Sequence, residues 1–75
     1  MLVDKVALGR RIKAMRQKLE MTQEEFAERL NCTNSHLGKI ENGKGGISIE
    51  LLVSVANMLH TTVDQLLVEW YPRYK

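Results

Sequence analysis

Cys32 and His36 stand four residues apart, a spacing at which two side chains on one face of a helix can bind the same metal ion. Only His60 and scattered carboxylates could complete such a site, so we expect no metal and interpret Cys32 as a small core residue. The sequence also contains no recognisable Ser/His/Asp arrangement, phosphate-binding glycine loop or pair of catalytic acids. It therefore predicts neither an enzyme nor a protein that needs a cofactor.

A second set of residues, between positions 23 and 42, fits two helices that cross at a sharp angle. Ala27 is small enough to leave space for the second helix, and Asn31 can adopt the left-handed conformation of a sharp turn at low cost. Leu37 and Ile40 can anchor the second helix. The apolar residues that complete this wedge are Phe26, Leu30 and Cys32. The pattern predicts a helix-turn-helix whose second helix leaves one face free to enter the major groove of DNA.

The elements that must position this motif are five short helices, and no segment has the alternating pattern of a strand. We expect the helices at about residues 4–20, 22–30, 33–42, 48–60 and 62–70. The residues expected to cap them are Asp4, Thr22, Thr33, Ser48 and Thr62, with Glu25 and Gln65 completing two reciprocal caps. The apolar positions of the first helix are Leu8, Ile12, Met15 and Leu19. Gly9 lies inside that helix, where glycine is less stable than alanine. This cost is tolerable if another helix must approach closely at that position. The predicted fold class is all-α.

Length and composition fit one small globular domain. A chain of 75 residues cannot divide its apolar residues between two cores, and no apolar run approaches the ~18 residues that span a bilayer. No secretory signal is recognisable, and the single cysteine leaves no intrachain disulfide, so we expect a cytoplasmic protein. Basic residues concentrate in the first half of the chain, where they form either a solvated helix face or a phosphate-binding surface.

Over residues 7–68 the sequence resembles the phage repressor and Cro family, the xenobiotic-response-element type of helix-turn-helix regulator. The segments that carry the resemblance are Leu8–Ile12, Arg16, Met21–Leu30, Ile40–Lys44, Val55–Leu59 and Val63–Leu67. Two positions depart from the family pattern: Asn31 replaces the usual turn glycine, and Ile47 stands where many members carry proline. The resemblance implies a compact five-helix fold like that of lambda repressor. It also implies a bacterial or phage regulator, which we expect to repress transcription.

The resemblance also implies the residues that contact DNA. It places Asn34, Ser35 and Lys39 against base edges, and these side chains suit that role because asparagine pairs with adenine and lysine donates to guanine. It assigns contacts to the DNA backbone to Gln23, Thr33, Asn42 and Lys44, and we place His36 at the edge of the same surface. Finally, it pairs Arg16 with Glu41, which would otherwise be two independent surface charges.

We expect a DNA-binding domain over residues 1–69, followed by a short tail at 70–75. Specific binding generally needs two half-sites, so we expect a homodimer on an operator with an inverted repeat. Trp70, Tyr71 and Tyr74 are the candidate dimer contacts, although Trp70 could instead fold back on the first helix near Gly9. An alternative function is an antitoxin or anti-repressor that keeps the fold but binds a protein. Such a module would show apolar or acidic residues at positions 34, 35, 38 and 39, which are Asn, Ser, Gly and Lys in this chain.

Overall fold

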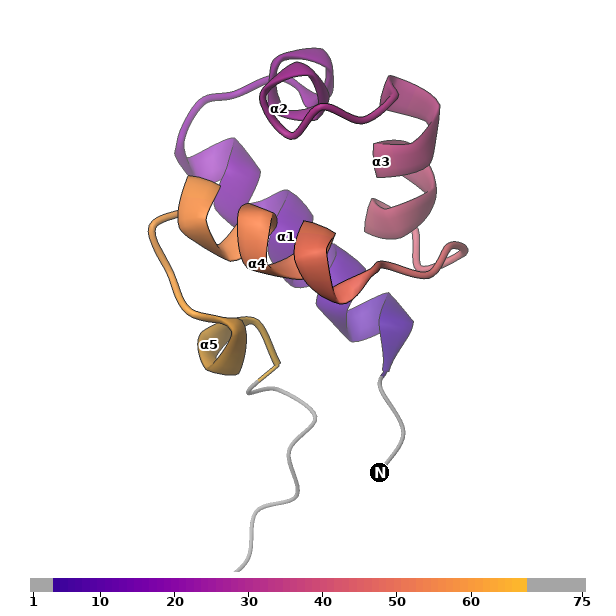
Figure 1. Ribbon diagram of the computed structural model, residues 1–75, viewed down its shortest axis with the longest axis vertical. Helices are drawn as coiled ribbons and strands as arrows, with labels where there is room; N and C mark the ends of the chain where they lie inside the picture. Colours follow the sequence, from indigo (N-terminus) through magenta and orange to yellow (C-terminus); the bar gives the residue numbers. More distant parts are fainter. Residues whose placement is uncertain (1–3, 68–75) are drawn as a thin grey trace, which may run out of the picture.

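The structure is a computed structural model that describes residues 4–67. Within that range the chain forms five helices and no strand (Figure 1): α1 Lys5–Lys18, α2 Gln23–Arg29, α3 Asn34–Glu41, α4 Ile49–Met58 and α5 Val63–Leu67. The all-α prediction is confirmed. None of these helices is both long enough and apolar enough to cross a membrane.

Side-chain caps start the helices at the positions that the sequence predicts. The hydroxyl groups of Thr22, Thr33 and Ser48 each accept a hydrogen bond from the amide three residues later. The carboxylate of Asp4 accepts from the amides of Val6 and Ala7. The Glu25 carboxylate also accepts from the Thr22 amide, which completes the reciprocal cap. Before α5, the Thr62 hydroxyl accepts from the amide of Gln65 at 3.1 Å. Each cap satisfies amides that have no partner inside their helix.

The core is built by all five helices, because each contributes one large side chain that is fully buried. These side chains are Ile12, Phe26, Leu37, Val55 and Leu66. Helix α3 packs against α1 and α2, while α5 packs against α1 and α4. Figure 1 shows α3 at one side of the molecule, next to α2, with α1 running obliquely to it. Helix α3 is therefore packed against α1 and α2 on one side, while Asn34, Ser35 and Lys39 on its other side are exposed.

Three helices are followed by a non-glycine residue in the left-handed region: Glu20 at φ 58°, Asn31 at φ 60° and His60 at φ 59°. The left-handed conformation predicted for Asn31 is confirmed. Glu20 was not expected to turn the chain, and Leu19 beside it is 41% exposed, so the expectation that Leu19 faces the core is wrong. The reason is that α1 ends at Lys18, and the chain turns away before Leu19 can complete the apolar face.

Candidate nucleic-acid interface

The two faces of α3 differ in burial. Leu37 and Ile40 are buried against the rest of the domain. Asn34, Ser35 and Lys39 are exposed, as is His36 in the first turn. The side chains that the sequence assigns to base contact therefore share the open surface of a helix whose opposite side is anchored.

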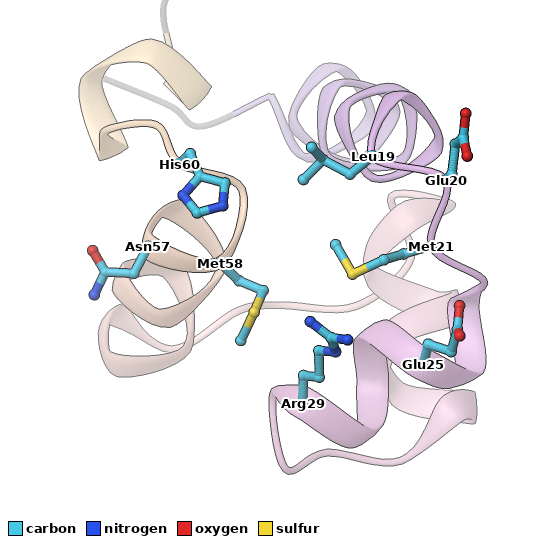
Figure 2. Close-up of a pocket in the computed structure, with 8 residues that line it drawn as sticks. All are labelled: Leu19, Glu20, Met21, Glu25, Arg29, Asn57, Met58 and His60. Carbon is cyan, nitrogen blue, oxygen red and sulfur yellow. The ribbon is translucent and has the colours of Figure 1, made fainter.

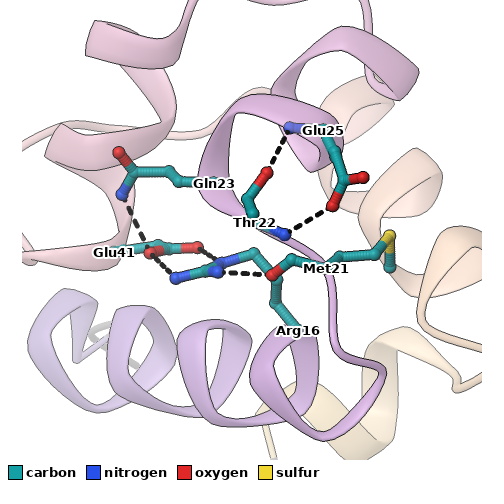
Figure 3. Close-up of polar contacts among 6 residues, drawn as sticks. All are labelled: Arg16, Met21, Thr22, Gln23, Glu25 and Glu41. Atoms are coloured by element: carbon teal, nitrogen blue, oxygen red, sulfur yellow. Dashed lines mark hydrogen bonds and ion pairs between the residues drawn. The ribbon is translucent and has the colours of Figure 1, made fainter.

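The C-terminal end of α3 is fixed by an ion pair to α1. Arg16 Nε donates to Glu41 Oε2 at 2.7 Å and Arg16 Nη2 donates to Glu41 Oε1 at 3.1 Å, so the guanidinium binds the carboxylate through two parallel bonds (Figure 3). Arg16 Nη1 also donates to the carbonyl oxygen of Met21 at 2.7 Å. Both charged residues are buried. The side chain of Arg16 thus connects α1 both to Met21, just before α2, and to Glu41 at the end of α3.

Gln23 joins the same network, which the sequence did not indicate. Its Nε2 atom donates to Glu41 Oε1 at 3.1 Å, so the Glu41 carboxylate accepts three hydrogen bonds from two residues (Figure 3). The amide of Gln23 lies beside Gly38, where a Cβ atom would be 3.6 Å from Gln23 Oε1. That distance is an ordinary van der Waals contact, so the bond does not depend on the missing side chain at Gly38, and no feature of the sequence indicated it.

The connection between α1 and α3 depends on Gly9. A Cβ atom at Gly9 would collide with the carbonyl oxygen of Ile40 and lie 2.7 Å from that of Glu41. The predicted close approach of another helix is therefore confirmed, and the helix that approaches is α3. Because the obstacle would be backbone, no side-chain movement could make room.

The residues assigned to the DNA backbone lie at the two ends of α3 and at the start of α2. Thr33 caps α3 by accepting from the His36 amide at 3.0 Å, and Asn42 is the C-cap residue of the same helix. Lys44 is exposed, and its amide donates to the Lys39 carbonyl at 2.8 Å. Gln23 opens α2. The structure brings these residues and the base-reading candidates to the surface around α3.

Two ionisable groups close to the motif have shifted pKa values. Hydrogen bonds from Thr22 hold the pKa of the Glu25 carboxyl below its usual range, while burial raises the pKa of the Cys32 thiol. Cys32 is half-buried and packs against the core, in keeping with its interpretation as a small core residue. Residues 4–67 bring together no group of three or more His, Cys, Asp or Glu side chains that could hold a metal ion.

A groove of about 570 Å³ opens elsewhere on the domain, between the end of α1, helix α2 and the end of α4 (Figure 2). Leu19, Met21 and Met58 provide its apolar lining, and the left-handed residues Glu20 and His60 lie at its edge. None of its lining residues comes from α3, so the groove is separate from the surface described above. The tail residues Trp70, Tyr71 and Tyr74 lie outside the described residues.

The chain is similar in sequence to two curated regulators. The chain is 36% identical over 62 residues to the HTH-type transcriptional regulator ImmR of Bacillus subtilis, covering 83% of this chain and 49% of ImmR. It is 34% identical over 64 residues to the immunity repressor protein of Bacillus phage phi105, covering 85% of this chain and 44% of that repressor. The chain thus spans about half the length of these curated relatives.

The fold also matches a solved regulator. The clp gene regulator ClgR from Corynebacterium glutamicum superposes with a TM-score of 0.82 at 32% identity, covering 92% of this chain and 72% of ClgR. The family profile described as helix-turn-helix, HTH_3, matches residues 12–66, which include the whole motif and the Arg16–Glu41 pair. The chain therefore belongs to the HTH_3 helix-turn-helix family.

Proposed function

We propose that the protein is a repressor that recognises an operator sequence by placing α3 in the major groove. The observation that carries this proposal is the division of α3 into a buried face and an exposed polar face. Leu37 and Ile40 anchor the helix, so the positions of Asn34, Ser35 and Lys39 are set by the core. Pre-positioned side chains lose less freedom when they bind. The phage repressor among the relatives supports repression as the mode of action.

In this proposal, Asn34, Ser35 and Lys39 read base edges while a second group holds the DNA backbone. The backbone group consists of Gln23, Thr33, His36, Asn42 and Lys44. Base contacts select the sequence, whereas backbone contacts fix the position of the protein on the duplex. Gln23 is already held by Glu41, so its amide is oriented before DNA arrives. We assign these roles to a DNA-binding domain at residues 1–69, acting in the cytoplasm, with residues 70–75 as a tail.

We further propose that two copies bind an inverted repeat as a symmetric homodimer. A single helix-turn-helix offers few side chains to base edges, and half-sites about one helical turn, 34–36 Å, apart allow two copies to bind one face of the DNA. The C-terminal aromatic residues Trp70, Tyr71 and Tyr74 are one candidate contact between the copies, since aromatic side chains are enriched at the centres of interfaces.

Selection of bound oligonucleotides tests the proposed reading surface. Asn34→Ala and Lys39→Ala should each relax the preference at one or two positions of the selected sequence by roughly 1–3 kcal/mol. Gln23→Ala should weaken binding to all sequences alike. Lys13→Ala, which removes an exposed positive charge from α1, is the control and should leave the consensus unchanged. A consensus unaltered by both Asn34→Ala and Lys39→Ala would show that the reading surface is misplaced.

A further inference from the structure

The groove between the end of α1, helix α2 and the end of α4 has an apolar floor. Leu19 is 41% exposed, and Met21 and Met58 are half-buried. Figure 2 shows these three side chains pointing into the space between the helices. Contact of such a floor with water is unfavourable unless something covers it. The volume of about 570 Å³ lies in the range of sites that hold a drug-sized ligand, so the groove has room for aromatic side chains.

Two residues at the edge of the groove keep a side chain where the backbone conformation favours glycine. Glu20 and His60 have φ values of 58° and 59°. A Cβ atom makes this conformation costly, and residues held in it cluster at sites that bind or switch. The cost at both edge positions therefore favours a binding role for this groove.

The segment that follows α5 has a composition that this groove can bind. Residues 68–75, which lie outside the described residues, contain every aromatic residue of the chain except the buried Phe26. Those aromatic residues are Trp70, Tyr71 and Tyr74. Aromatic rings make favourable contacts with the thioether sulfur of methionine, and two methionines form part of the floor of the groove.

The charges of the groove and of this segment are complementary. The segment carries Arg73 and Lys75, while two carboxylates line the groove. The Glu25 carboxylate accepts from the Thr22 amide and is under the positive charge of Arg29. Glu20 is exposed at the edge of the groove, where its carboxylate can attract a basic side chain.

Helix α5 brings the segment within reach of the groove. It packs against α1 and α4, the two helices whose ends form the groove. Successive Cα atoms are about 3.8 Å apart and a helix rises about 1.5 Å per residue, so Leu67 lies within about 18 Å of His60. At about 3.3 Å per residue, residues 68–75 reach roughly 26 Å from Leu67. At Gly9, by contrast, the Cβ side of α1 faces the carbonyl groups of α3.

We propose that residues 68–75 bind in the groove of their own chain, with the aromatic rings on its apolar floor and the basic residues beside Glu20. None of the lining residues belongs to α3, so the bound segment leaves the surface around α3 open. Aromatic rings held in the groove are not free to contact a second copy. Binding within the chain therefore competes with the tail contact between copies considered above, and it lowers the fraction of the protein that can dimerise through the tail.

Fluorescence of the free protein tests the proposal, because Trp70 is the only tryptophan of the chain. In the parent, its emission should be blue-shifted and protected from acrylamide quenching relative to the urea-unfolded protein. Leu19→Gln should shift the equilibrium toward the released segment by roughly tenfold, because it removes apolar area from the groove without replacing a buried residue.

Val53→Gln is the matched control. Val53 is 44% exposed, close to the value for Leu19, and lies with the exposed Ile49 on α4, outside the groove. The emission and quenching of this variant should equal those of the parent.

The other outcomes overturn the inference. Parent emission like that of the unfolded protein would do so, as would equal quenching of Trp70 in the parent and in Leu19→Gln. Emission that shifts on dilution from micromolar to nanomolar protein would assign the segment to a contact between copies. The measurement contains no DNA, so a failure of the proposed function in the oligonucleotide selection is a separate result.

A second measurement does not depend on the stability of the glutamine variant. Cys32→Ser removes the only cysteine of the chain, and adding Leu19→Cys and Tyr74→Cys places one thiol in the groove and one in the segment. Mild air oxidation should join the two thiols within one chain, which the mass of the intact monomer reports as the loss of both thiol hydrogens. Val53→Cys with Tyr74→Cys in the same background is the control and should stay reduced. A disulfide that forms only between chains, or equally in the control, would contradict the proposed binding.

Discussion

Glu41 is the residue that anchors the end of α3 to the rest of the domain. Its carboxylate accepts from both Arg16 and Gln23, and the Arg16 and Glu41 side chains are only 8% and 1% exposed. Charges removed from water to this extent are costly unless each has its partner. The network therefore fixes the position of α3 strongly, and it makes the domain sensitive to the loss of any one member.

We expect Glu41→Leu to destabilise the fold by about 3–5 kcal/mol, because the Arg16 guanidinium stays buried without its counter-charge. The double variant Arg16→Met/Glu41→Leu should recover much of this loss, since it strands no charge. Urea unfolding of the parent and both variants measures the difference. Glu28→Leu removes an exposed carboxylate from α2 and should have little effect. A double variant no more stable than Glu41→Leu would argue against a coupled pair.

At the scale of elements, the angle between α2 and α3 is set by Asn31, which follows α2 in the left-handed conformation. This conformation costs a residue with a Cβ roughly 1–2 kcal/mol, but asparagine tolerates it better than most side chains. Asn31→Gly should therefore be neutral or slightly stabilising, and Asn31→Val should destabilise the domain because branched residues resist positive φ. Thermal melts compare the three proteins. A valine variant as stable as the parent would show that the turn has a different conformation.

The packing of α3 on α1 gives a second prediction at this scale, with two glycines as a matched pair. Gly9→Ala places a methyl group against the Ile40 and Glu41 carbonyls, and overpacking of this kind typically costs about 1–3 kcal/mol. Gly46→Ala makes the same change where no atom lies within 4 Å of the new Cβ. It should leave the free energy of unfolding nearly unchanged. Equal unfolding free energies for the two variants would mean that α3 is free to move away from α1.

For the whole molecule, the proposed DNA complex predicts a dependence on salt. The net charge of the chain is only +2, so attraction to DNA depends on where the cations lie. Each phosphate neutralised by a cation contributes about 0.9 to the slope of log affinity against log salt concentration. Lys44→Gln should therefore reduce that slope by about 1 for each bound copy.

Lys18→Gln is the control for this measurement, because it removes the same charge from the far end of α1. It should leave the slope unchanged if the basic residues of α1 form a solvated face. Equal reductions from the two variants would instead extend the phosphate-binding surface to α1, the alternative that the charge pattern leaves open.

The five helices, their caps and the turn at Asn31 were predictable from the sequence, because these features depend on interactions between residues a few positions apart. It also indicated the close approach at Gly9, although not that α3 is the helix that approaches. Helix ends were less predictable: Leu19 continues the apolar spacing of α1, yet the chain turns at Glu20 and leaves it exposed. Two further features depend on how the helices pack together. The bond between Gln23 and Glu41 and the uncovered face formed by Ile49 and Val53 arise only when separate helices pack, since burial depends on neighbours distant in the sequence.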